Sequence, residues 1–145
     1  MKLLTKAMKV SSILMIFASI IRFFFGITFM NFFATAVNMR QVGKEQMPFL
    51  LTAFVVTVLS APGELVAGII GAATCEEPSF VHRGFIAGIA ALVVSVAGMI
   101  MQVIIGYGAS EVTVICGIVC PAVFVVFSLM GTIAAAKKRK KKAAK

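Results

Sequence analysis

Four apolar runs, each long enough to cross a lipid bilayer, constrain this chain more than any other feature of its sequence. The runs extend over about residues 13–36, 49–73, 84–107 and 112–136, and a basic tail follows at 137–145. Crossing the hydrocarbon core takes about 20 predominantly apolar residues in a helix. Because backbone amides in lipid find no water to bond, each run must be helical. We therefore predict an all-α integral membrane four-helix bundle that forms a single transmembrane domain over 1–145.

The composition fits a chain whose main solvent is lipid. Hydrophobic residues make up 61% of the 145 positions and charged residues 13%, and the mean hydropathy is +1.07. Soluble domains carry about 45–50% apolar and about 25% charged residues. A soluble fold of this length would not have enough polar side chains to cover its surface. The alternating pattern of a membrane β-barrel is missing from the sequence.

The first run has a second interpretation, a cleaved signal peptide. A basic start precedes it, and Ala34-Thr35-Ala36 resembles an A-x-A cleavage site. However, the run is longer than the apolar core of a usual signal peptide and contains Arg22. We expect it to be retained as a transmembrane helix.

The basic residues predict on which side of the membrane the two ends lie. Lys2, Lys6 and Lys9 precede the first run. Seven basic residues follow the last run: Lys137, Lys138, Arg139, Lys140, Lys141, Lys142 and Lys145. Because positively charged flanks stay in the cytoplasm, we predict a multi-pass protein of the cytoplasmic (plasma) membrane with both termini cytoplasmic, N-in and C-in.

Two opposite charges lie inside the apolar runs, Arg22 in the first and Glu64 in the second. Counted from the inner surface at 1.5 Å per residue, Arg22 lies at a depth of about 18 Å and Glu64 at about 14 Å. The difference between the two depths is within the reach of an arginine side chain. Since charges at such depths usually face the bundle and pair, we predict an intramembrane ion pair. Its role stays open between fixing the helix register and serving as a charge relay or ion site. A further alternative is that Arg22 snorkels toward the inner surface.

Pro62 and Gly63 interrupt the second run just before Glu64. Proline removes one helical hydrogen bond and clashes with the preceding turn, so we predict a kink or break here. Glu64 would then lie near the positive end of the inner half-helix. Broken helices form binding sites of this kind in transporters, although proline kinks in membrane helices are mostly structural.

Small residues recur every four positions in the second and third runs. They are Gly63, Ala67 and Gly71 in the second run and Gly84 and Gly88 in the third. Such stripes let two helix backbones approach closely. We expect close helix contacts here, with the partner helix inside the chain preferred over one from another subunit.

The tail Lys137, Lys138, Arg139, Lys140, Lys141 and Lys142 predicts contact with anionic lipid headgroups. A basic run can also bind nucleic acid through its phosphates. No aromatic residue is interleaved with these positions and no folded basic domain accompanies them. We therefore expect membrane lipids as partners of the tail and no nucleic acid.

The sequence offers little for metal, cofactor or catalytic chemistry. Its three cysteines, Cys75, Cys116 and Cys120, form no CxxC motif, and His82 is the one histidine. A structural zinc site takes about four Cys or His ligands. No nucleophile and base are recognisable as a pair. We predict neither a metal site nor a cofactor, and no enzymatic activity.

The glycines and prolines of the last three runs carry a resemblance to a protein family. The resembling segments are 65–71, the connection that contains Pro78, and 116–131 with Pro121. They resemble small uncharacterised four-helix integral membrane proteins of Gram-positive bacteria. The resemblance implies a bacterial cytoplasmic membrane and implies no activity.

Two functions remain as predictions. The first is an accessory or structural membrane protein, or a subunit of a membrane complex, because the connections are short and the packing motifs strong. Its partner would be another membrane protein or further copies of the chain. The alternative is a small transporter or channel that uses the Arg22/Glu64 pair, with Asn31 and Gln102 as further polar groups inside the runs.

Overall fold

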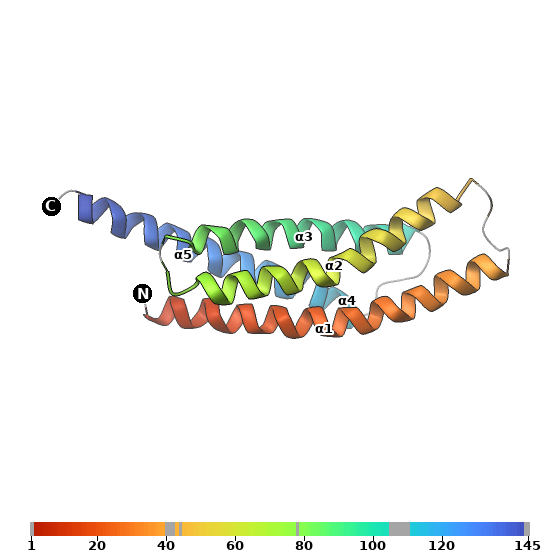
Figure 1. Ribbon diagram of the computed structural model, residues 1–145, viewed down its shortest axis with the longest axis horizontal. Coiled ribbons are helices and arrows are strands. Elements are labelled where there is room, and N and C mark those ends of the chain that lie inside the picture. Colours follow the sequence, from red (N-terminus) through yellow and green to blue (C-terminus); the bar gives the residue numbers. More distant parts are fainter. Residues whose placement is uncertain (1, 40–42, 44, 78, 105–110, 144–145) are drawn as a thin grey trace.

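The fold consists of helices alone within the part of the chain that the structure describes. The computed structural model describes residues 2–39, 43, 45–77, 79–104 and 111–143. Its elements are α1 (Lys2–Asn38), α2 (Met47–Thr74), α3 (Val81–Ile104), α4 (Glu111–Val114), the π-helix η1 (Ile115–Val119) and α5 (Cys120–Ala143) (Figure 1). The last three follow one another directly, so they form one continuous rod.

Four segments are long and apolar enough to cross a membrane. They are Lys2–Thr35, Met47–Thr74, Val81–Ile104 and Glu111–Lys141. Each contains one of the four predicted runs, apart from residue 36 at the end of the first run and 105–107 at the end of the third. Residues 105–107, Pro78 and Lys145 lie outside the described residues.

Two of the predicted boundaries are wrong, because the helices continue past the ends of the apolar runs. α1 begins at Lys2 instead of residue 13, and α5 continues through the basic tail to Ala143 instead of ending at 136. Lysine, arginine, alanine, leucine and methionine are all good helix formers. The apolar composition therefore stops before the helix does, and hydropathy alone underestimates the length of these two helices.

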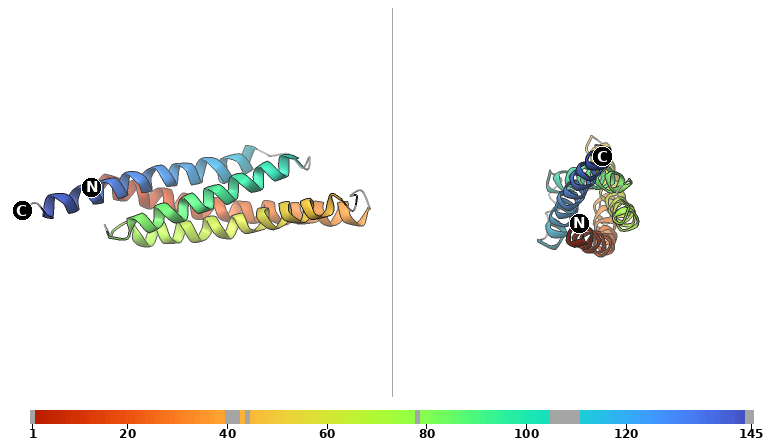
Figure 2. Two further views of the ribbon diagram at one scale, coloured as in Figure 1. Left: turned by 90° about the horizontal axis from the view of Figure 1, so that it is seen from above. Right: turned by 90° about the vertical axis from the view of Figure 1, so that its left-hand side faces the viewer.

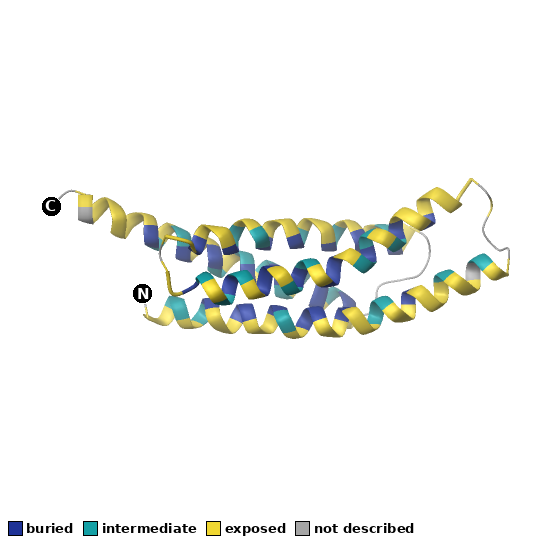
Figure 3. Cartoon of the chain, in the orientation of Figure 1, coloured by how far each residue is buried: buried dark blue, intermediate teal, exposed yellow. Residues whose placement is uncertain are grey.

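The helices lie side by side, with both ends of the chain at the same end of the bundle (Figures 1 and 2). We call this the basic end, because the lysines of α1 and α5 gather there. α2 packs against both α1 and α3, and α5 packs against α3 and α1. Buried residues form stripes along the helices (Figure 3). One core cluster, next to the middle of the bundle, consists of Met15, Ala67, Ala91 and Phe124.

Small residues do bring helices of this chain close together, although not at every predicted position. A Cβ added to Gly84 would lie 3.3 Å from the Cα of Gly71, so α2 and α3 approach through their backbones. A Cβ at Gly88 would lie 2.7 Å from the Phe124 ring. Ala67 is buried in the core cluster. Gly63 is a correction: a Cβ there would meet no atom of the described residues within 4 Å, so it mediates no close contact.

The sequence predicts a kink or break at Pro62 and Gly63, and the break does not occur. α2 runs through both residues as one helix, with Pro62 inside it, and its first half lies at an angle to its second half (Figure 1). α2 packs against both α1 and α3. Packing against neighbouring helices is one reason why membrane helices tolerate proline. Glu64 therefore lies within a continuous helix and not at a helix end.

Candidate functional site

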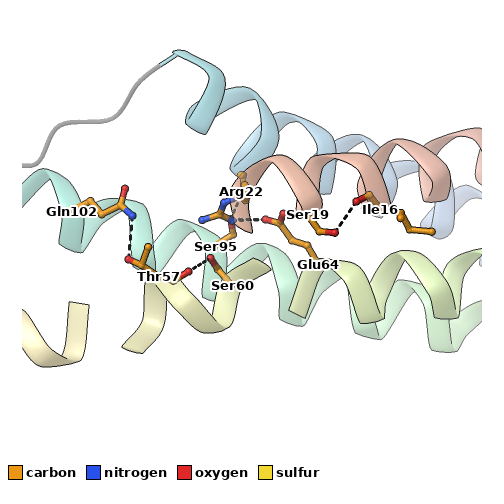
Figure 4. A network of polar contacts seen from close by, with 9 residues as sticks. Ile16, Ser19, Arg22, Thr57, Ser60, Glu64, Ser95 and Gln102 are labelled. Carbon is orange, nitrogen blue, oxygen red and sulfur yellow. Dashed lines mark hydrogen bonds and ion pairs between the residues drawn. The ribbon is translucent and has the colours of Figure 1, made fainter. Parts of the chain in front are cut away.

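Arg22 and Glu64 meet in the interior of the bundle. α1 and α2 are antiparallel neighbours, and the Arg22 Nη1 atom forms an ion pair and hydrogen bond with the Glu64 Oε1 atom (Figure 4). The side chains are 3% and 0% exposed, respectively. Arg22 therefore does not extend toward the basic end, as snorkelling would require. A buried pair of this kind is favourable only with good geometry and further hydrogen bonds to its remaining polar atoms.

Ser95 of α3 supplies such a further contact. Its hydroxyl accepts a hydrogen bond from Arg22 Nη1. The same oxygen lies 2.9 Å from Glu64 Oε1 and 2.5 Å from the carbonyl oxygen of Gly117. Because a serine hydroxyl has one proton, it donates to one of these two acceptors at a time. Ser95 thus joins α1, α2 and η1 to α3.

The Gly117 carbonyl lacks its α-helical donor because of a proline one turn later. In an α-helix this carbonyl would accept from the backbone N–H of residue 121, but Pro121 has none. The chain there forms the π-helix η1, in which the Cys120 N–H bonds the carbonyl of Ile115. π-Helical turns are frequent at functional sites. Here the turn presents the Gly117 carbonyl to Ser95.

Gly117 also makes room for the arginine. A Cβ on Gly117 would lie 3.1 Å from Ser95 Oγ and 3.2 Å from Arg22 Cζ. Both distances are tighter than ordinary van der Waals contact. We name Arg22, Glu64, Ser95 and Gly117 the central cluster. The second carboxylate oxygen, Glu64 Oε2, is buried and has no hydrogen-bond partner among the described residues.

A small polar cavity adjoins Arg22 on the side away from the basic end. Its volume is about 10 Å³, and Arg22, Thr57, Gln102 and Thr113 line it together with Phe25 and Gly26. Gln102 Nε2 donates to Thr57 Oγ1 across α3 and α2 (3.1 Å; Figure 4). A cavity of this size holds about one water molecule. On the other side of Arg22, the cluster of Met15, Ala67, Ala91 and Phe124 fills the core.

Sequence reasoning located two members of the central cluster and missed the other two. Ser95 is one small polar residue in an apolar run, and such residues are common in membrane helices. The usable signal was Pro121, because it identifies the carbonyl four residues earlier as lacking its helical donor. Of the two further polar residues noted in the sequence, Gln102 lies beside the cavity, whereas Asn31 is exposed on α1.

The remaining candidate residues lie apart from the central cluster. Lys137, Lys138, Arg139, Lys140 and Lys141 are exposed on α5, and the Lys142 side chain lies outside the described part. Cys75, Cys116 and Cys120 are free thiols. Among the described residues, no three His, Cys, Asp or Glu side chains gather closely enough to hold a metal ion.

Comparisons of the chain with protein-family models, with curated proteins and with solved structures find no match.

Proposed function

We propose that this chain is a small accessory or structural subunit of a membrane complex, multi-pass in the cytoplasmic membrane, with no enzymatic activity of its own. The observation that carries the proposal is the central cluster. It takes Arg22 from α1, Glu64 from α2, Ser95 from α3 and Gly117 from η1. One set of hydrogen bonds thus ties together all four membrane-length segments.

Such a cluster acts as a register device. Sliding any one helix by a turn, about 5.4 Å, would separate its member from the other three. A buried charge would then have no partner, which is costly in an apolar interior. Backbone contact between Gly71 and Gly84 fixes α2 against α3 in the same way. These features support a bundle built to hold one shape.

The outer surface of the bundle supports the membrane assignment and a partner. Large apolar side chains are exposed on every long helix, including Phe17, Leu59, Val93 and Val126. Away from the basic end, α1 and α2 project beyond α3 (Figure 1). Met39, just past the end of α1, and Leu51, in the first part of α2, are exposed, and Phe33 of α1 stacks on Phe54 of α2 with ring centroids 4.9 Å apart. The projecting parts of α1 and α2 thus offer apolar surface for another membrane protein.

The placement of both termini in the cytoplasm is inferred from the basic residues and can be tested separately. The basic end carries the lysines of α1 and α5, which supports cytoplasmic termini. In a cysteine-free background, we expect the new thiol of Lys2→Cys or Ala143→Cys to be protected from an impermeant maleimide added to intact cells. The thiol of Glu45→Cys should react. The reverse pattern would overturn the N-in, C-in arrangement.

The subunit role is tested by gentle purification from native membranes on an affinity tag, with mass spectrometry of what co-purifies and in what ratio. We expect a foreign membrane protein in fixed stoichiometry. A tagged, unrelated four-helix protein expressed at the same level identifies non-specific contaminants. A lone monomer or a homo-oligomer would overturn the proposal.

A second candidate function, a small transporter or channel, is favoured by the polar cavity beside Arg22. Thr57, Gln102 and Thr113 bring hydrogen-bonding groups toward the ion pair from one side. The test is proton flux into liposomes, read by a trapped pH-sensitive dye. This function requires flux that is lost in Glu64→Gln and retained in Glu76→Gln, whose carboxylate forms an exposed pair with Lys9. Absence of proton flux in the unmodified protein would eliminate a proton path through the bundle.

A further inference from the structure

A groove lies at the basic end, between the start of α3 and the last part of α5. Its volume is about 300 Å³, and His82, Thr132, Ala135, Ala136 and Arg139 line it. The four α5 positions follow the spacing i, i+3, i+4 and i+7, so they occupy one face of that helix. Two of them are alanines, which leave the face hollow. α5 also extends past the start of α3 (Figure 1), so the groove opens toward that end.

The electrostatics of the groove favour an anion. Arg139 and His82 line it, and no Asp or Glu does so among the described residues. The exposed side chains of Lys138 and Lys140 flank Arg139 in the sequence of α5. α3 is a helix of 24 residues that begins at Val81. The positive end of its dipole adds to the positive electrostatic potential at the groove. Two carboxylates precede α3 in the sequence and do not line the groove: that of Glu76 is paired with Lys9 at 3.0 Å, and that of Glu77 is exposed.

The position of the groove along the bundle indicates that the anion is amphipathic. The polar side chains His82 and Arg139 begin where the apolar segments end. Inward along the helices, Ile86 on α3 and Leu129 on α5 are exposed. A ligand here meets positive charge at one end and an apolar surface at the other. In the membrane placement proposed above, this is where a phospholipid headgroup meets its acyl chains.

We propose that this groove is a binding site for one anionic phospholipid, with its phosphate between His82 and Arg139 and its acyl chains along α3 and α5. Guanidinium groups bind phosphate oxygens through charge-assisted, often paired hydrogen bonds. Ala135 and Ala136 provide the space for the headgroup. Thr132 donates its hydroxyl proton to the Ser128 carbonyl (2.8 Å), so it presents the ligand with an acceptor only. The inference rests on the proposed membrane location and not on the subunit role.

Arg139 has a matched control on the same helix. Lys137 carries the same charge two positions earlier, about 200° around the helix and so on nearly the opposite face. Changing either residue to glutamine alters the net charge of the tail equally. Only a defined groove distinguishes the two changes, whereas diffuse attraction of a basic tail does not. Ala136→Leu fills the groove without altering any charge.

The test is a titration of the full-length protein in detergent with phosphatidylglycerol, read by native mass spectrometry. Phosphatidylcholine and inorganic phosphate serve as alternative ligands. We expect one phosphatidylglycerol per chain and much weaker binding of phosphatidylcholine. Losing one charge-assisted contact in Arg139→Gln should weaken binding about tenfold. Lys137→Gln should weaken it by about twofold at most, and Ala136→Leu should abolish the one-to-one complex. All variants must keep the melting temperature of the unmodified protein.

Equal losses in Arg139→Gln and Lys137→Gln would overturn the site in favour of diffuse attraction. Equal binding of phosphatidylcholine, or full competition by inorganic phosphate at equal concentration, would overturn its lipid specificity. Full binding by Ala136→Leu would place the lipid elsewhere. The result is independent of the subunit role: a lone chain that retains one lipid supports the groove and overturns that role, and a stoichiometric complex without lipid does the reverse.

Discussion

At the residue scale, Ser95 is the member of the central cluster that joins the most helices. Its oxygen accepts from Arg22 and lies within hydrogen-bond distance of Glu64 and of the Gly117 carbonyl. Without it, three buried groups from α1, α2 and η1 each lose a partner. A buried polar group left unsatisfied costs about 1–3 kcal/mol.

Ser95→Ala should therefore lower the free energy of unfolding by about 1–3 kcal/mol. Ser128 supplies the matched control, because both serines are 0% exposed and Ser128 Oγ has no hydrogen-bond partner among the described residues. Ser128→Ala should leave stability unchanged or raise it. Reversible unfolding in mixed micelles, followed by circular dichroism, measures both. Equal losses from the two substitutions would contradict the assignment of Ser95.

The thiol of Cys75, just past the end of α2, gives a pH-dependent prediction. Burial raises the pKa of Cys75, and the neighbouring Glu76 carboxylate raises it further, while Lys9 lowers it. The thiol also donates to the carbonyl of Ala72 (3.2 Å), which favours its protonated form. Because the thiolate is the nucleophile, Cys75 should react slowly with iodoacetamide at neutral pH and faster as pH rises.

The neighbouring charges should shift this profile in opposite directions. In a background with Cys116 and Cys120 changed to alanine, Glu76→Gln should move the rate profile to lower pH and Lys9→Gln to higher pH. The rate of alkylation against pH measures each shift. If the midpoint of the rate profile of the unmodified Cys75 lay at or below the pH found for an unstructured cysteine peptide, the pKa of Cys75 would not be raised.

At the scale of the element, α2 has glycines of two different kinds. Gly71 faces α3 and the Phe124 ring, and a Cβ there would collide with that ring. Gly63 lies two turns earlier along the same helix and faces open space. Spacing by four residues places glycines near one another on a helix surface but does not say what lies opposite them.

Alanine substitutions at these two positions should have opposite effects on stability. Gly71→Ala overpacks the interface and should destabilise the protein by about 1–3 kcal/mol. Gly63→Ala adds helix propensity without a clash and should stabilise it by about 0.4–1 kcal/mol. Thermal unfolding in detergent provides the comparison. If Gly63→Ala proved as damaging as Gly71→Ala, the face assigned to Gly63 would be wrong.

The elements show which properties of this fold are readable from sequence. Hydropathy located all four apolar segments, because each needs about 20 apolar residues. It misplaced the ends of α1 and α5, since lysine is unfavourable in lipid but favourable in a helix. Matching depths brought Arg22 and Glu64 to the same level. Ser95 and Gly117 were missed, because the rotation of α3 and η1 about their axes depends on packing and leaves no trace in hydropathy.

At the scale of the whole molecule, polarity divides the bundle into three levels. Basic residues and the groove lined by His82 and Arg139 lie at one end, and the central cluster lies in the interior. At the other end, α1 and α2 project beyond α3 (Figure 1). Among the described residues, the pair of Arg22 and Glu64 is the one buried ion pair, and the other described pair, Lys9 with Glu76, is exposed. The pair of Arg22 and Glu64 is thus the contact that holds the membrane-length segments in register.

The most direct test of that role is the unfolding free energy of four proteins: the unmodified chain, Arg22→Gln, Glu64→Gln and the double variant. Each single change leaves a buried charge without its partner and should cost about 3–5 kcal/mol. The double variant removes both charges, so it should recover most of that loss. A double variant destabilised by the sum of the two single effects would show that the charges act independently, and would contradict the central claim.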